Sequence, residues 1–291
     1  ATRMQQAAGL QEQLRIARRE ISTAPGGLDQ ASPHPVAAPP APDSTKPGPL
    51  ARMGGHRHRL AFILLAIVFL VNYAETAVET YLRETDGIGV ERGYDLARAA
   101  HWFEGGTPIE GFASPGKVVI YGYSVAYFFA FLGLAFATAY ALARAPGRTP
   151  FLTFAVAVTA NYAISLPFFL FFPVPERWAY PDSGAILLSD LWAPELIELI
   201  RPFSGLDNCF PSFHVSLTVV AVALAFIYRL RFRWPALWIG LLIILSTLVL
   251  GIHWVTDVVA GLASGILAVQ LARVVTPLLD DGGEVAGPAS A

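Results

Sequence analysis

Long apolar runs constrain the fold of this chain more than any other feature of its sequence. Six of them follow residue 58, at 60–80, 118–142, 150–172, 213–230, 234–252 and 255–275. Each is close to the roughly 20 residues that an α-helix needs to cross the hydrocarbon core of a bilayer. Only 14% of all residues are charged, whereas a soluble domain carries about 25%. The sequence therefore predicts an all-α integral membrane protein, built as a six-helix transmembrane bundle.

The segments outside these runs divide the chain into three parts. The stretch 23–50 is dense in Pro, Ala, Ser and Gly, a composition that cannot bury a core. We therefore expect a disordered N-terminal tail at 1–58, a six-helix domain at 59–276 and a C-terminal tail at 277–291. The net charge of −2 gives no sign of nucleic-acid binding. Because Cys209 is the only cysteine, an intramolecular disulfide and a multi-cysteine metal site are excluded.

The distribution of Lys and Arg predicts which side of the membrane each connection occupies. Basic residues precede the first run and fill the second and fourth connections (Lys46, Arg52, Arg57, Arg59, Arg144, Arg148, Arg229, Arg231 and Arg233). The two long connections, 81–117 and 173–212, hold six acidic residues each. We therefore expect a plasma (inner) membrane protein with both termini cytoplasmic and the long connections outside. Amphipathic pieces at 94–103 and 189–200 are expected to lie on the membrane surface.

Two histidines stand where apolar runs meet the predicted outer boundary. His214 begins the run 213–230, and His253 follows the apolar stretch 235–250, four residues before Asp257. Ionisable groups at such depth are costly and are functional candidates by default. If a helix begins at 253–257, His253 and Asp257 share a face, and the carboxylate sets the tautomer and orientation of the imidazole. This pair suits a nucleophile that attacks phosphorus, while His214 protonates the leaving oxygen at the extracytoplasmic face.

The segment before His214 and two arginines are suited to hold a phosphate. Ser212 is placed to cap the helix that begins at residue 213, and a helix N-terminus favours an anion. Arg177 and Arg201 are the only basic residues in the connection 173–212. A guanidinium can contact a phosphate in a bidentate manner. We therefore expect Ser212, Arg177 and Arg201 to bind the phosphate, and we expect neither a metal nor another cofactor.

These motifs resemble those of the type-2 phosphatidic acid phosphatase superfamily, over roughly residues 118–275. The segment Pro211-Ser212-Phe213-His214 is similar to the family's second motif, P-S-G-H, and the stretch from Ser246 to Asp257 keeps the spacing of the third, S-R-x5-H-x3-D. The resemblance implies that His253 is the nucleophile, Asp257 its orienting partner and His214 the general acid. It implies a membrane enzyme that acts on a lipid phosphate or phospholipid through a phosphohistidine intermediate, which makes 59–276 the catalytic domain.

The chain departs from the family pattern at its phosphate-binding positions. Thr247 stands where the third motif has an arginine, and Arg201-Pro202 keeps only the ending of the first motif, K-x6-R-P, with Pro194 in the place of the lysine. These departures resemble the inositol phosphorylceramide synthase branch, in which the phosphoryl group passes to a second lipid alcohol. The segment 173–178 also resembles the proline-rich segment of that branch, which favours Arg177 as a phosphate ligand.

Two bulky side chains beside the histidines also favour a lipid alcohol as the acceptor. Phe213 replaces the glycine of the second motif, and Trp254 follows His253. Both are expected to narrow the pocket and to make its walls apolar. Because a covalent phosphohistidine is resolved by whichever acceptor reaches it first, a drier pocket favours transfer to a lipid alcohol over hydrolysis.

Other functions stay open at this point. One is a lipid phosphate phosphatase that releases inorganic phosphate from phosphatidic acid or polyprenyl phosphate. Another is a metal-dependent hydrolase with His214, His253 and Asp257 as ligands, and a third is a lipid-binding or transport protein without catalysis. Glu75 and Glu79, in the first apolar run, either pack between helices or line a headgroup pocket.

Overall fold

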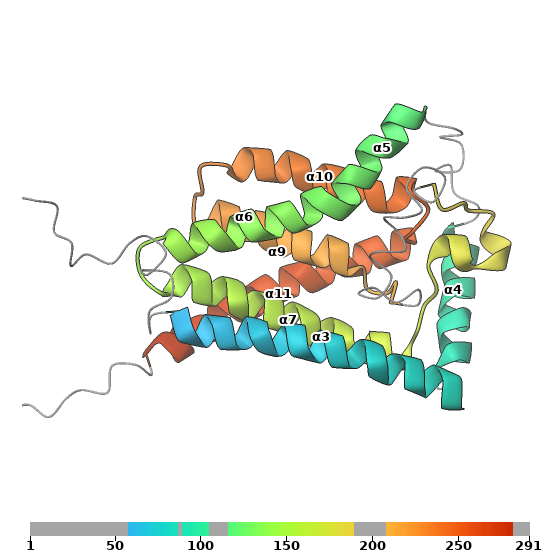
Figure 1. The fold of residues 1–291 in the computed structure, drawn as a ribbon, viewed down its shortest axis with the longest axis horizontal. Coiled ribbons are helices and arrows are strands. Elements are labelled where there is room, and N and C mark those ends of the chain that lie inside the picture. Colours follow the sequence, from blue (N-terminus) through green and yellow to red (C-terminus); the bar gives the residue numbers. More distant parts are fainter. Residues whose placement is uncertain (1–57, 87–88, 105–115, 189–207, 282–291) are drawn as a thin grey trace, which may run out of the picture. The chain divides into compact units, whose positions relative to one another are not determined.

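The computed structural model describes residues 58–86, 89–104, 116–188 and 208–281. Within these ranges the regular structure is helical, and the only extended pairing is an isolated bridge between Val174 and Asn208. The tail 1–57, the amphipathic piece 189–200 and Arg201 lie outside the described residues. The helices, labelled as in Figure 1, are α3 (Arg59–Asp86), α4 (Val90–Glu104), α5 (Lys117–Val125), η2 (Ala126–Ala130), α6 (Phe131–Arg144), α7 (Thr149–Phe171), η3 (Arg177–Ala179), η4 (Pro181–Ser183), α9 (Phe213–Ile227), α10 (Arg233–Val249) and α11 (Val255–Asp281).

All six apolar runs form helices, and their lengths support a multi-pass membrane protein. Four described stretches are long and apolar enough to cross a bilayer: Arg59–Glu79, Val118–Arg144, Thr149–Phe171 and Val255–Asp280. The helices α9 and α10 are apolar but shorter, with 15 and 17 residues. The helix α9 ends at Ile227, before the end of the apolar run 213–230, because the chain then turns through Arg229, whose φ is 51°. Four spans are supported by length, and the count of six stays a prediction.

The arginine-rich connections and the loops that precede α9 and α11 lie at opposite ends of the helix bundle. The connections between α6 and α7 and between α9 and α10 lie at one end, and the loops before α9 and before α11 lie at the other (Figure 1). At the first end, α11 continues past residue 276, and its Asp280 carboxylate accepts hydrogen bonds from Arg148 and Thr149. The arginine-rich connections are therefore separated by the length of the bundle from the loops before α9 and α11, here called the histidine loops because they lead into His214 and contain His253.

A close crossing of α9 and α11 brings the two histidine loops together. A Cβ added at Gly261 would lie 2.6 Å from the Ser212 carbonyl oxygen, and one added at Gly265 would lie 2.5 Å from that of Ser216. Small residues spaced by four allow two membrane helices to approach closely. The Ser212 N–H also donates to the Asp257 carbonyl oxygen over 3.1 Å. The first turns of α9 and α11 are thereby held side by side.

Candidate active site

The loop that carries His253 is held by its backbone. Gly251 has a φ of 74°, and a Cβ there would lie 2.6 Å from the Ile186 carbonyl oxygen. The N–H groups of Arg177 and Trp178 donate to the carbonyl oxygens of Ile252 and Gly251 over 2.9 and 3.1 Å. Only glycine adopts this left-handed conformation readily. The segment after α7 thus fixes the exit from α10 and the position of His253.

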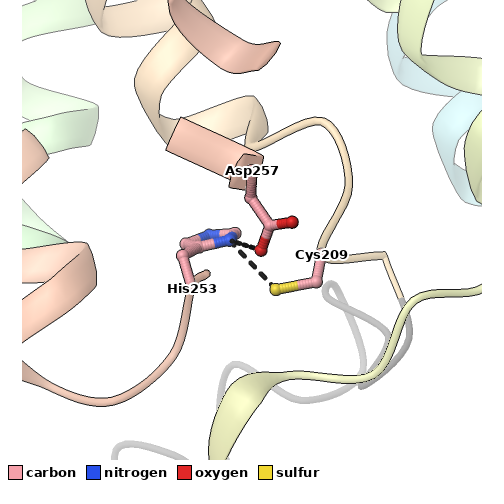
Figure 2. Close-up of side chains that lie close together, drawn as sticks. All are labelled: Cys209, His253 and Asp257. Carbon is pink, nitrogen blue, oxygen red and sulfur yellow. Dashed lines mark hydrogen bonds and ion pairs between the residues drawn. The ribbon is translucent and has the colours of Figure 1, made fainter. Parts of the chain in front are cut away.

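Three side chains contact the two ring nitrogens of His253. Nδ1 lies 3.4 Å from Oδ2 of Asp257 and 3.0 Å from Sγ of Cys209, as Figure 2 shows. Nε2 lies 3.1 Å from Oγ of Ser212. The Asp257 carboxylate also accepts the Trp254 N–H over 2.8 Å. His253, Asp257 and Ser212, three of the predicted site residues, therefore lie in one buried hydrogen-bonded group.

These contacts determine which ring nitrogen of His253 carries the proton. A carboxylate beside Nδ1 favours a proton on that nitrogen, which leaves the lone pair on Nε2. Ser212 can donate its hydroxyl to that lone pair, and its oxygen caps α9 by accepting the Val215 N–H over 3.4 Å. A phosphate that enters would compete for the same hydroxyl. The lone pair of His253 Nε2 and the hydroxyl of Ser212 therefore lie at one position.

His214 lies in the first turn of α9 and is held by aromatic rings. Its ring stacks on Tyr127 with 4.1 Å between centroids and lies against Phe131 at 4.3 Å. The centroids of His214 and His253 are 6.2 Å apart. Tyr127 belongs to the π-helical turn η2, an irregularity often found at functional sites. The two histidines line one cavity.

A cavity of about 670 Å³ connects both histidines to the interior of the bundle. Its lining runs along α3 from Glu75 to Leu65, a rise of about 15 Å at 1.5 Å per residue. Apolar side chains of α6 and α7 line the same length, and three of the lining residues, Phe69 of α3 and Leu132 and Phe136 of α6, are also exposed. The cavity is therefore polar at the histidines, apolar along its length, and open between α3 and α6.

A hydrogen-bonded group at the cavity, here called the acidic wall, consists of three lining residues, Glu75, Tyr162 and Asn208, and of Glu79, which is hydrogen-bonded to Asn208. Tyr162 donates its hydroxyl to Glu75 over 3.2 Å, and Asn208 donates to Glu75 and Glu79 over 3.1 and 3.0 Å. Arg83 pairs with Glu79. Glu75 is only 4% exposed, yet it lines the cavity together with Tyr162 and Asn208. Among the described residues, no donor reaches the buried Oδ1 of Asn208.

The structure places Arg177, Phe213 and Trp254 differently relative to the cavity. Arg177 is 2% exposed, and its guanidinium lies 5.6 Å from the centre of the Trp254 ring, beside the His253 loop. Phe213 lines the cavity as expected. The expectation for Trp254 is wrong, because this side chain is fully buried behind the site, where its indole N–H donates to the Pro175 carbonyl oxygen.

Sequence reasoning missed several residues that shape the site. Cys209 was used only to exclude a disulfide and a multi-cysteine metal site, although it directly precedes the segment 210–214 and contacts His253. Glu104, at the end of α4, accepts the Thr256 N–H and hydroxyl and so caps α11. Tyr127 carried no sequence signal, because aromatic residues are common in apolar helices. For Cys209 the available signal was a thiol adjacent to the predicted phosphate turn.

Comparison with known proteins gives one match. The family model of the PAP2 superfamily matches residues 120–279, which include α9, α10, most of α11 and both histidine loops. Neither the search of curated proteins nor the search of solved structures found a match. The matched stretch begins after α3 and α4, so Glu75 and Glu104 lie outside it.

Proposed function

The chain belongs to the PAP2 superfamily, and from this premise we propose that it is a lipid phosphotransferase with a histidine nucleophile. The superfamily comprises lipid phosphoesterases of the phosphatase or phosphotransferase type. The observation that carries the proposal is the group of Ser212, His253 and Asp257 in the same cavity as His214. A nucleophile oriented by a carboxylate and a second histidine across a shared space are the parts that phosphoryl transfer requires.

The proposed reaction has two steps. Nε2 of His253 attacks phosphorus, the bond from phosphorus to the leaving oxygen breaks, and protonated His214 gives that oxygen its proton. An acceptor hydroxyl then attacks the phosphohistidine, His214 takes the hydroxyl proton, and His253 is released. Asp257 stabilises the charged imidazole, and Ser212 transfers its hydrogen bond from Nε2 to a phosphate oxygen. No metal takes part in either step.

The cavity supports a lipid as the substrate. Its apolar length and its opening between α3 and α6 suit an acyl or prenyl chain that enters from the side. Phe213 lies next to the general acid and limits the space for water. The acidic wall would repel a second phosphate, but its oxygens can accept hydrogen bonds from the hydroxyl of an alcohol. We therefore favour a lipid alcohol over water as acceptor, as in the inositol phosphorylceramide synthase branch.

The products of turnover distinguish a lipid alcohol from water as the acceptor. We expect that phosphorus label from a lipid phosphoester donor will appear in a new lipid faster than in free phosphate or in a phosphorylated headgroup. The assay uses the full chain in mixed micelles, with a panel of lipid monophosphates and diesters, each with and without added lipid alcohols. Rapid release of inorganic phosphate that no alcohol diminishes would instead identify a phosphatase.

A variant of the acidic wall tests how the acceptor binds. Glu75→Gln keeps the size of the side chain and removes its charge. We expect it to raise the KM for the alcohol by about tenfold, as for a lost charge-assisted hydrogen bond, and to slow leaving-group release much less. Equal effects on both steps would assign Glu75 to helix packing.

Arg177 is proposed as a phosphate ligand together with Arg201, which stands outside the described residues. Arg177→Ala should lower kcat/KM by about 10²–10³-fold, because developing charge on the phosphoryl oxygens loses a charge-assisted contact. Arg98→Ala is the matched control, because Arg98 is exposed and its ion pair among the described residues is with Asp95 on the same helix. Thermal unfolding of each variant separates lost binding from lost packing against Trp254. Near-wild-type kinetics in Arg177→Ala would remove this residue from the site.

A further inference from the structure

The three side chains in Figure 2 form a set of metal-ligating atoms. The Cys209 sulfur, a His253 ring nitrogen and an Asp257 carboxylate oxygen lie within 4.8 Å of one another, and all three residues are buried. Across the described part of the chain, no other three His, Cys, Asp or Glu side chains meet this criterion. A thiolate, an imidazole and a carboxylate together make a donor set that suits Zn²⁺. His214, which the metal-hydrolase alternative requires, is not part of the set.

The distances fit a tetrahedral ion with little movement. Typical zinc bond lengths imply about 3.5 Å between sulfur and nitrogen ligands and about 3.3 Å between nitrogen and oxygen ligands. The corresponding separations at His253 Nδ1 are 3.0 Å to Cys209 and 3.4 Å to Asp257. Cys209 and His253 also line the cavity, which provides a path for entry and a position for a water molecule as fourth ligand.

We propose that Cys209, His253 and Asp257 form an inhibitory site for a thiophilic divalent cation of the Zn²⁺ class. Binding of the ion depends only on the three side chains. The inhibition rests on the proposed function, because it requires that His253 is the nucleophile. A metal at this site is an inhibitor and not a cofactor.

The ion would inhibit by changing the tautomer of His253. Zn²⁺ displaces the Cys209 thiol proton to solvent and takes the lone pair of Nδ1 after that nitrogen gives up its proton. The single proton of the neutral imidazole then resides on Nε2, where it can be donated to Ser212 Oγ, 3.1 Å away. A protonated Nε2 has no lone pair with which to attack phosphorus. The ion therefore blocks the nucleophile from the opposite side of the ring.

Cobalt spectroscopy tests the site without any need for turnover. Co²⁺ added to the full chain in detergent should produce a sulfur-to-cobalt charge-transfer band and the visible bands of a tetrahedral ion, at one ion per chain. Cys209→Ser keeps a polar side chain of similar size and should lose the charge-transfer band. The absence of that band in the wild type, or its persistence in Cys209→Ser, would overturn the site.

Inhibition is measured as the zinc concentration that halves the turnover rate within each variant. Cys209→Ser should need about tenfold more Zn²⁺ than the wild type, or more, while His101→Ala should match the wild type. A chelator should restore the wild-type rate. Equal zinc sensitivity in all three proteins would overturn the proposal. Cobalt bound at sulfur without inhibition would argue against His253 as nucleophile and leave the site intact, whereas turnover that requires zinc would overturn both proposals.

Discussion

Replacing His253 with alanine should reduce turnover on the order of 10⁴-fold or more, because His253 is the proposed nucleophile and no neighbour can replace a nucleophile. Cys209 and Ser212 contact the same ring, but the thiol is buried and the hydroxyl lacks a base once the imidazole is gone. The measurement is the initial rate with the best lipid substrate from the product assay, in the full chain. Residual activity within tenfold of the wild type would exclude His253 as nucleophile.

Two controls separate lost chemistry from lost structure. His101→Ala removes another histidine close to the site, one that lies 6.2 Å from the Trp254 ring and does not line the cavity. It should retain most of the activity. Rapid acid-free quenching with labelled substrate should trap phosphorus on the wild-type chain, in an alkali-stable and acid-labile form, and trap none on His253→Ala. Label that persists in His253→Ala would place the covalent intermediate on another residue.

The helices that carry the site could be predicted because they depend on local sequence. The long apolar runs predict helices without reference to the rest of the chain, and four described stretches have the length and composition of spans. Helix ends were less predictable, because they depend on single turns. The helix α9 stops at Ile227 before the left-handed Arg229, and α10 stops before Gly251, which lies against the Ile186 carbonyl.

The chemistry of the site could be predicted only as far as its residues are close in sequence. His253 and Asp257 are only four positions apart, and their side chains meet as predicted, but α11 begins at Val255, so His253 reaches Asp257 from the loop before the helix and not from a shared helix face. Cys209 reaches His253 from 44 positions away, and Asn208 reaches Glu75 from 133 positions away. Such contacts depend on how α3, α9 and α11 pack, and no local pattern encodes them. Trp254 was misplaced for the same reason, because its burial is set by α4 and the segment after α7.

A second large loss of turnover is expected when His214 is replaced. Replacing it with alanine or glutamine should slow the wild-type reaction by about 10²–10⁴-fold, the usual contribution of a general acid. Glutamine retains a hydrogen-bonding group of comparable length between Tyr127 and Phe131 but cannot transfer a proton. A loss shared by both variants therefore reports proton transfer, whereas a loss confined to alanine would report packing against these rings.

The leaving group provides the sharper test of this role. A lipid alkoxide needs a proton as it departs, whereas a nitrophenolate is stable without one. Both His214 variants should therefore recover much of their lost rate on a nitrophenyl phosphoester, and they should accumulate labelled phosphohistidine, since the second step still needs His214 to take the acceptor's proton. His253→Ala should recover nothing on the same substrate, because attack on phosphorus precedes any departure. Equal losses on both leaving groups would show that His214 holds the site together and does not protonate the leaving oxygen.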